Sequence, residues 1–139
     1  MSTQSKLLAT LAGFATYFLL GFLFYGVLFS GMVDTMAGSA GNVMRSDDSM
    51  VWWALIVGNI AMAYLLVHIF SKWASISTFI GGLKGGATIG LILAIAYDFT
   101  SYGTTNVLNL TGVLVDIAVM IVLMGLTGGV VGAMLGRSK

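Results

Sequence analysis

Four long apolar stretches, separated by short polar segments, restrict what this chain can fold into. The first covers residues 7–33 and holds no formal charge over 27 residues, more than the roughly 20 that a helix needs to cross the hydrocarbon core of a bilayer. The others cover about 50–70, 85–102 and 110–135. We therefore predict an all-α, integral membrane four-helix bundle that forms a single domain over residues 1–139 and contacts the lipid bilayer.

The composition supports the same class. Hydrophobic residues make up 58% of the chain and charged residues only 8%, against roughly 25% charged in a soluble domain. The net charge of +1 and the scattered basic residues argue against a nucleic-acid partner. Cysteine is absent, which excludes disulfides and thiolate metal sites. We predict no cofactor.

The first apolar stretch has a second interpretation. Lys6 precedes it and small residues follow at 37–41, an arrangement that also occurs in secretory signal peptides. The stretch is much longer than the roughly 7 to 15 apolar residues of a signal core. We therefore expect residues 7–33 to remain as a membrane span.

A polar, Gly- and Ser-rich loop over residues 34–49 precedes the second span. Its acidic pair, Asp47 and Asp48, follows Ser46 just before the next apolar run. Oxygen side chains cap helix N-termini, and carboxylates are favourable there. We predict that these residues cap the second helix, with an ion site as the alternative.

Basic residues predict the orientation in the membrane. With the N-terminus inside, five basic residues fall on the inner side and only Arg45 falls outside. Cytoplasmic segments of membrane proteins carry the excess of Lys and Arg. We therefore predict cytoplasmic N- and C-termini. The five inner residues are Lys6, Lys72, Lys84, Arg137 and Lys139.

Asp98 and Asp116 are the only acids inside the long apolar runs, where a charge is costly and usually functional. Asp98 lies about 6 Å before the end of the third span and Asp116 about 9 Å after the start of the fourth, at 1.5 Å per residue. Both therefore occupy the same depth. Their helical faces also carry small residues such as Ala94 and Gly112, so we expect both acids to face the bundle interior.

Two carboxylates at one depth with no basic residue nearby are not both comfortably ionised, so one is expected to be protonated or to share a proton. A proton relay or a cation site has this arrangement. The alternative, which the sequence favours, is a packing role, because polar groups frequently join membrane helices. The hydrogen-bond partners would then come from Tyr97, Thr100, Ser101, Asn106 or another bundle hydroxyl.

Two further polar residues lie in the second span. Asn59 falls near its middle, where an amide more often bonds a neighbouring helix than a substrate. His68 is the only histidine and lies near the end of the span. It is a weak candidate ligand for a haem or chlorophyll metal, but without a second ligand an interfacial role is more common.

Glycines repeat every four residues in the third and fourth spans. Such stripes of small residues let two helix backbones approach closely. They serve contacts either within this bundle, which we favour, or with another membrane protein. The helix-packing candidates are Gly82, Gly86 and Gly90, in or just before the third span, and Gly128, Gly132 and Gly136, in or just after the fourth.

Several short segments carry a resemblance. They are GFLFYGVLF at residues 21–29, AYDFTSYGTTN at 96–106, the later Asp116, and MGLTGG at 124–129. Together they resemble small bacterial four-helix predicted inner-membrane proteins of unknown function. The resemblance implies a bacterial inner membrane and no particular activity.

No enzyme motif is present: the chain has no HExxH sequence, no Walker motif, no dinucleotide glycine motif and no nucleophile with a base. We therefore predict that the protein is not an enzyme. The first expected function is a structural or accessory subunit that binds other membrane protein subunits or forms a homo-oligomer. The alternative is a small proton- or cation-coupled transporter that uses Asp98 and Asp116.

Overall fold

The computed structural model describes residues 2–41 and 43–137, and these ranges contain helices and connections but no β-strand. The predicted all-α class is thus confirmed. In chain order the helical elements are α1 Thr3–Gly21, the π-helix Phe22–Leu28, the 3-10 helix Ser30–Met32, α2 Val33–Met36, the 3-10 helix Asp47–Ser49, α3 Trp52–His68, the π-helix Ile69–Trp73, α4 Phe79–Thr104 and α5 Leu110–Gly136.

Within the described residues, four helices are long and apolar enough to cross a membrane, namely Thr3–Leu28, Trp52–Trp73, Phe79–Thr104 and Leu110–Gly136. By length and composition the chain is therefore a multi-pass membrane protein. The bounds differ in places from the predicted ones. The third helix begins at Phe79 and not at about Gly85, because the Thr78 hydroxyl caps it by accepting a hydrogen bond from the Gly81 N–H at 3.1 Å.

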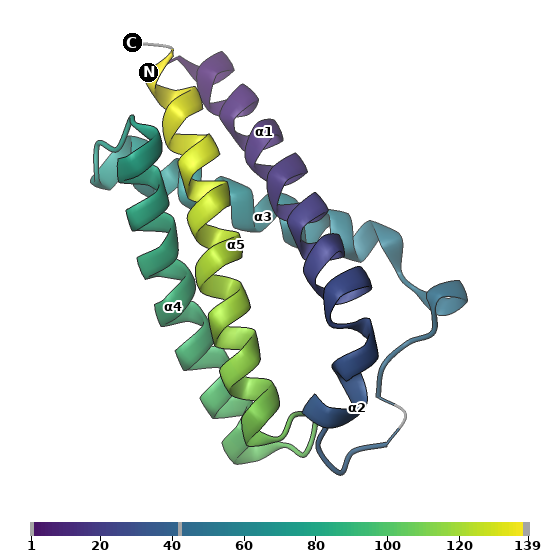
Figure 1. Ribbon diagram of the computed structural model, residues 1–139. Helices are drawn as coiled ribbons and strands as arrows, with labels where there is room; N and C mark the ends of the chain where they lie inside the picture. The colour runs from purple at the N-terminus through teal and green to yellow at the C-terminus, as the bar shows by residue number, and fades with distance from the viewer. Residues whose placement is uncertain (1, 42, 138–139) are drawn as a thin grey trace.

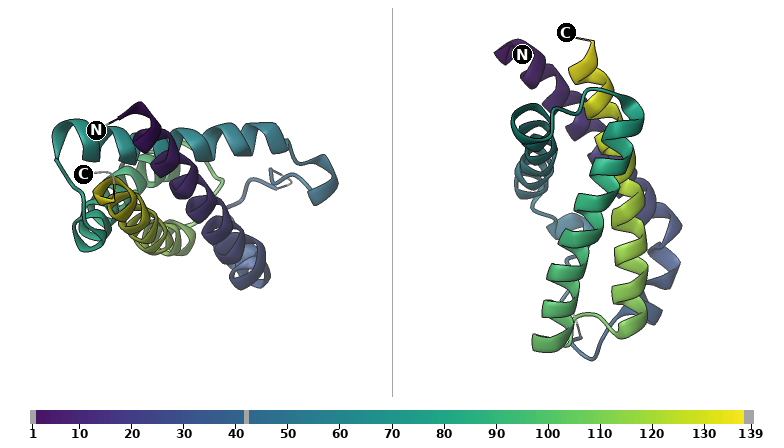
Figure 2. Two further views of the ribbon diagram at one scale, coloured as in Figure 1. Left: turned by 90° about the horizontal axis from the view of Figure 1, so that it is seen from above. Right: turned by 90° about the vertical axis from the view of Figure 1, so that its left-hand side faces the viewer.

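The four long helices do not all run the same way. In Figure 1, α1, α4 and α5 run roughly side by side, while α3 lies across them. The right-hand view of Figure 2 shows α3 nearly end-on and α5 along its length. Only the second half of α3 is packed: Ala63, Leu66 and Val67 are buried, whereas no residue from 52 to 60 is.

The core lies where α1, α3 and α5 meet. Ala9 and Leu66 are buried there together with Val131. Gly13 permits the crossing, since a Cβ at this position would lie 2.7 Å from Cγ2 of Val131 and 3.3 Å from Cβ of Ala63. Small residues on α1 thus allow three helices to approach at one point.

A seam of small residues joins α4 to α5. Buried residues recur every four positions along α4, at Gly82, Gly86, Gly90, Ala94 and Asp98. A Cβ on Gly86 would overlap the carbonyl oxygen of Met124 and approach Cα of Gly128 to 3.0 Å. The glycine stripes therefore pack against each other within this chain, which is the first of the two alternatives that the sequence left open.

The other stripe glycines extend this contact towards the helix ends. A Cβ on Gly82 would overlap the Gly128 carbonyl oxygen, and one on Gly132 would overlap that of Thr78. Gly136 is placed in the same way against the Ser77 carbonyl oxygen. The seam thus runs from the start of α4 to Asp98.

The capping prediction for the second span is wrong. Asp47–Ser49 forms a separate 3-10 turn, closed by a 3.1 Å hydrogen bond between the hydroxyls of Ser46 and Ser49. Met50 is extended, and α3 begins only at Trp52, after Val51, without a side-chain cap. The acidic pair is separated from the helix because the turn uses its own serines to satisfy its polar groups.

Both ends of the chain lie at the same end of the bundle (Figure 1). Lys6 lies near the start of α1 and Arg137 directly after α5, and the connection from α3 to α4 lies at this end too. Lys72 lies in the last turn of the π-helix before that connection, and Lys84 lies in the second turn of α4. Lys139, which was counted with them, lies outside the described residues.

Candidate functional site

The glycine seam positions the two membrane acids. Gly86 packs against Met124 and Gly90 against Met120, so each turn forward on α4 corresponds to a turn back on α5. Two turns beyond Gly90, this antiparallel register reaches Asp98 on α4 and the level of Asp116 on α5. The side chains of the two acids interact directly there.

Asp98 is deeply buried and incompletely bonded. It is 3% exposed, and its Oδ2 atom has no hydrogen-bond partner. Within residues 2–41 and 43–137, no lysine, arginine or histidine forms an ion pair with it. A carboxylate oxygen removed from water normally has a partner, because leaving it without one is costly.

The hydroxyls that were expected to bond Asp98 bond elsewhere. Thr100 donates to the Ala96 carbonyl at 2.6 Å, and Ser101 pairs with Thr105 at 3.3 Å. Tyr97 is 76% exposed. Thr100 and Ser101 bond along their own helix, so neither hydroxyl supplies the hydrogen bond to Asp98 that the packing interpretation expected.

Asp116 has a partner from another helix. The Tyr25 hydroxyl donates a 2.5 Å hydrogen bond to Asp116 Oδ1. Tyr25 lies in the π-helix that follows α1, and π-helical turns are frequent at functional sites. Tyr17, two turns earlier, is close enough to interact electrostatically with Asp116, and its hydroxyl lies 3.7 Å from Met120 Sδ.

Neither tyrosine was predicted from the sequence as a site residue. The available signal was their spacing, since Tyr17, Gly21 and Tyr25 recur every four residues. This spacing was not sufficient for a prediction, because it does not show which other helix packs against α1. The hydrogen bond from Tyr25 to Asp116 joins residues that lie 91 positions apart in the chain.

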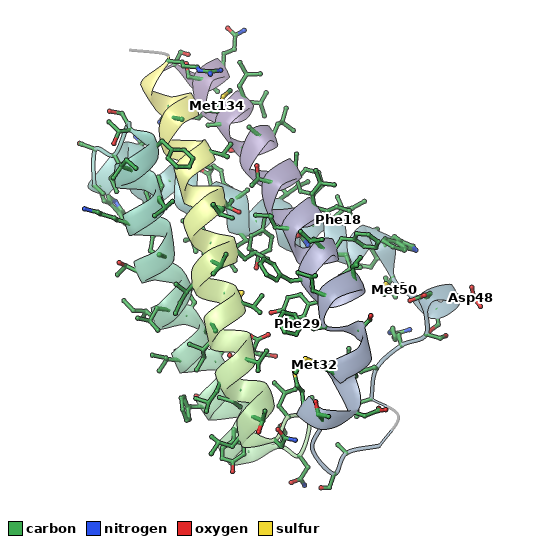
Figure 3. The ribbon with its side chains drawn as sticks, viewed as in Figure 1. Phe18, Phe29, Met32, Asp48, Met50 and Met134 are labelled. Carbon is green, nitrogen blue, oxygen red and sulfur yellow. The ribbon has the colours of Figure 1, made fainter. Side chains whose placement is uncertain are left out.

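A cavity of about 240 Å³ adjoins the site. Among the described residues that line it, Asp116 and Tyr25 alone carry polar side chains. Figure 3 shows Phe29, another lining residue, pointing into the space between α1 and α5. The full lining is Tyr25, Phe29, Val33, Met36, Ala37, Val43, Met44, Val107, Leu108, Gly112, Val115 and Asp116.

The first loop forms a firmly attached cover over this cavity. The Gly38 N–H donates to the Val107 carbonyl at 2.8 Å, and the Asn109 N–H donates to the Met36 carbonyl at 3.0 Å. The Asn109 side chain also donates to the Thr35 carbonyl at 2.7 Å. These bonds join the loop to the turn between α4 and α5, so the cavity is held in shape by backbone contacts.

Asn59 and His68 lie apart from the acid pair. Asn59 donates to the Leu55 carbonyl of its own helix at 2.6 Å, and not to a neighbouring helix as expected. His68 packs between aromatic rings, with centroids 5.8 Å from Tyr64 and 5.2 Å from Trp73. Among the described residues, no group of three or more His, Cys, Asp or Glu side chains could hold a metal ion.

No family model, curated protein or solved structure is significantly similar to this chain. The functional proposal therefore rests only on the side chains of the site. Two carboxyl groups in contact, with no basic neighbour, favour holding one proton between them. The arrangement can release that proton or exchange it for a cation.

Proposed function

We propose that the protein is a small multi-pass carrier in which Asp98 and Asp116 exchange a proton for a cation. The observation that carries this proposal is the burial of Asp98, whose Oδ2 atom has no hydrogen-bond partner apart from the neighbouring carboxyl group of Asp116. A residue that only joined helices would have its hydrogen bonds made. A residue that binds and releases a proton needs an oxygen atom that has no other hydrogen-bond partner when the proton is absent.

The neighbouring groups have definite roles in such an exchange. One proton held between Asp98 and Asp116 leaves the pair with a single negative charge, and a cation that approaches Asp116 displaces this proton. The Tyr25 hydroxyl holds Asp116 in position through its hydrogen bond. The cavity lies directly beside Asp116 and is bordered by the first loop and by the turn between α4 and α5.

Wild-type protein in proteoliposomes tests the proposal. A pH-sensitive dye inside the vesicles should report proton movement when a cation is added outside, and the response should require the protein. We expect exchange with at least one of sodium, potassium or a small organic ammonium ion. A correctly folded preparation that gives no proton movement with any of them would contradict the carrier.

An accessory subunit is the second candidate, and α3 favours it. Residues 52–60 have no buried member, and Trp53 is 71% exposed. An apolar half-helix of this kind faces either lipid or another membrane protein. Extraction in mild detergent followed by co-purification tests this candidate. An accessory subunit should be recovered together with a stoichiometric partner.

We also propose a bacterial inner membrane with both termini cytoplasmic. The resemblance of residues 21–29 and 96–106 supports the bacterial inner membrane. The position of Lys6 and Arg137 at one end of the bundle, with Arg45 in the first loop, supports the orientation. The chain has no cysteine, so Ser39→Cys and Ser75→Cys each introduce a unique label. An impermeant maleimide should label position 39 in intact cells, and position 75 only after permeabilisation. The reverse pattern would invert the orientation.

A further inference from the structure

The cavity beside Asp116 has the chemistry of a ligand site. We infer that it binds a small organic ammonium ion, whose nitrogen is held by the Asp116 carboxylate and whose apolar part contacts the surrounding side chains. This inference rests on the proposed cation exchange and specifies the cation. It follows from the cavity lining, its volume and the burial of Asp98.

The lining disfavours calcium and magnesium. Calcium takes six to eight oxygen ligands, and magnesium retains several waters that themselves need polar partners. The described lining offers only Asp116 and Tyr25 as polar side chains, against apolar groups such as Phe29, Met36 and Val115. A ligand here needs one charged group and a largely apolar remainder.

The charge of the site selects a cation. Asp116 lines the cavity, and Asp98 interacts with it directly, so an anion is repelled. A neutral apolar molecule would leave the Asp116 carboxylate without a counter-charge in an apolar space, which is unfavourable. An ammonium ion supplies the charge and N–H donors, and aromatic rings such as Phe29 and Tyr25 attract organic cations.

The volume limits the size of the ligand. About 240 Å³ exceeds the roughly 30 Å³ that one water occupies in the liquid. It falls below the roughly 300 to 1,000 Å³ of sites for drug-sized molecules. A ligand of the size of benzylammonium or butylammonium is suitable.

Asp98 supplies an observation that is independent of the cavity. It does not line the cavity, yet it is 3% exposed with an unpartnered Oδ2 next to Asp116. A proton can be held there when the cavity is empty. An ammonium ion at Asp116 then compensates the charge in place of that proton, which couples binding to proton release.

Benzylammonium binding to the full-length protein in detergent tests the inference, with isothermal titration calorimetry as the readout. Benzyl alcohol and benzoate are the neutral and anionic controls of the same shape. We expect benzylammonium to bind and both controls to fail. Asp116→Asn should weaken binding by about 10- to 100-fold, the effect of losing a charged hydrogen-bond partner.

Two variants of neighbouring residues locate the ligand. Val115→Trp places a large side chain in the cavity and should weaken binding by about tenfold or more. Leu114→Trp is the matched control, because Leu114 is 56% exposed and does not line the cavity. If Val115→Trp does not fold, Val107→Trp is used in its place. Val107 also lines the cavity, on the side where the first loop covers it.

Three outcomes would overturn the inference. These are equal binding of benzyl alcohol, equal weakening by Leu114→Trp and Val115→Trp, or no benzylammonium binding at all. If proteoliposomes still exchange protons for sodium or potassium without benzylammonium binding, the carrier stands and the organic ligand is wrong. If benzylammonium binds selectively but no proton moves, the ligand site stands and the carrier is wrong.

Discussion

Replacing Gly86 with leucine is expected to separate α4 from α5 and to lower the free energy of unfolding by about 3 kcal/mol or more. Even one added Cβ would overlap the Met124 carbonyl oxygen and lie 3.0 Å from Cα of Gly128. Both neighbours are backbone atoms, which cannot turn aside as a side chain can. The two helices would have to move apart and lose close contacts along the seam.

Thermal unfolding in detergent, followed by tryptophan fluorescence, measures this effect. Gly103→Leu is the matched control, because Gly103 lies in the same helix and a Cβ there would meet nothing within 4 Å. Leucine is also a better helix former than glycine. The control should therefore unfold at the wild-type temperature or above. Equal losses in the two variants would show that the seam is not a close contact.

The second large effect is expected from Asp98→Asn, which should remove proton-coupled flux from proteoliposomes by about 100-fold or more. An amide does not titrate in this range, so it cannot bind and release the proton. The variant should nevertheless fold, with a free energy of unfolding within about 1 kcal/mol of wild type. An amide avoids the cost of a buried charge and can donate a hydrogen bond to Asp116.

The control for this substitution is Asp34→Asn, because Asp34 is an exposed acid in α2. It removes the same charge away from the acid pair and should leave flux unchanged. Asp98→Asn combined with Asp116→Asn should cost little more flux than either change alone, since coupled sites are not additive. Undiminished flux in a folded Asp98→Asn protein would assign the pair to packing instead.

The sequence was sufficient for the fold class because long apolar runs report directly on helix number and length. It was less informative at α4, where Phe79 and Ile80 could be read as connection or as helix, and the Thr78 cap decides for helix. The direction of α3 was not predictable. Hydropathy measures whether a helix can cross a membrane and contains no term for the angle at which it packs.

The site was predictable only in part. The depths of Asp98 and Asp116 follow from counting residues back to the turn between their helices, so their association could be expected. The hydrogen bond from Tyr25 to Asp116 could not, because it depends on how α1 packs against α5. The π-helix around Tyr25 has no recognised sequence signal, and the cavity depends on the path of the first loop.

The crosswise position of α3 has a consequence for the surrounding lipid. Figure 3 shows Asp48 and Met50 roughly level with Phe29, partway along the bundle and not at its lower end. A flat bilayer whose normal followed α5 would enclose Asp48 in hydrocarbon, where a charge is costly. Headgroups and water therefore have to reach inwards on this flank. The protein is expected to thin the bilayer locally beside the first half of α3, at a cost of a fraction of a kcal/mol per ångström of mismatch.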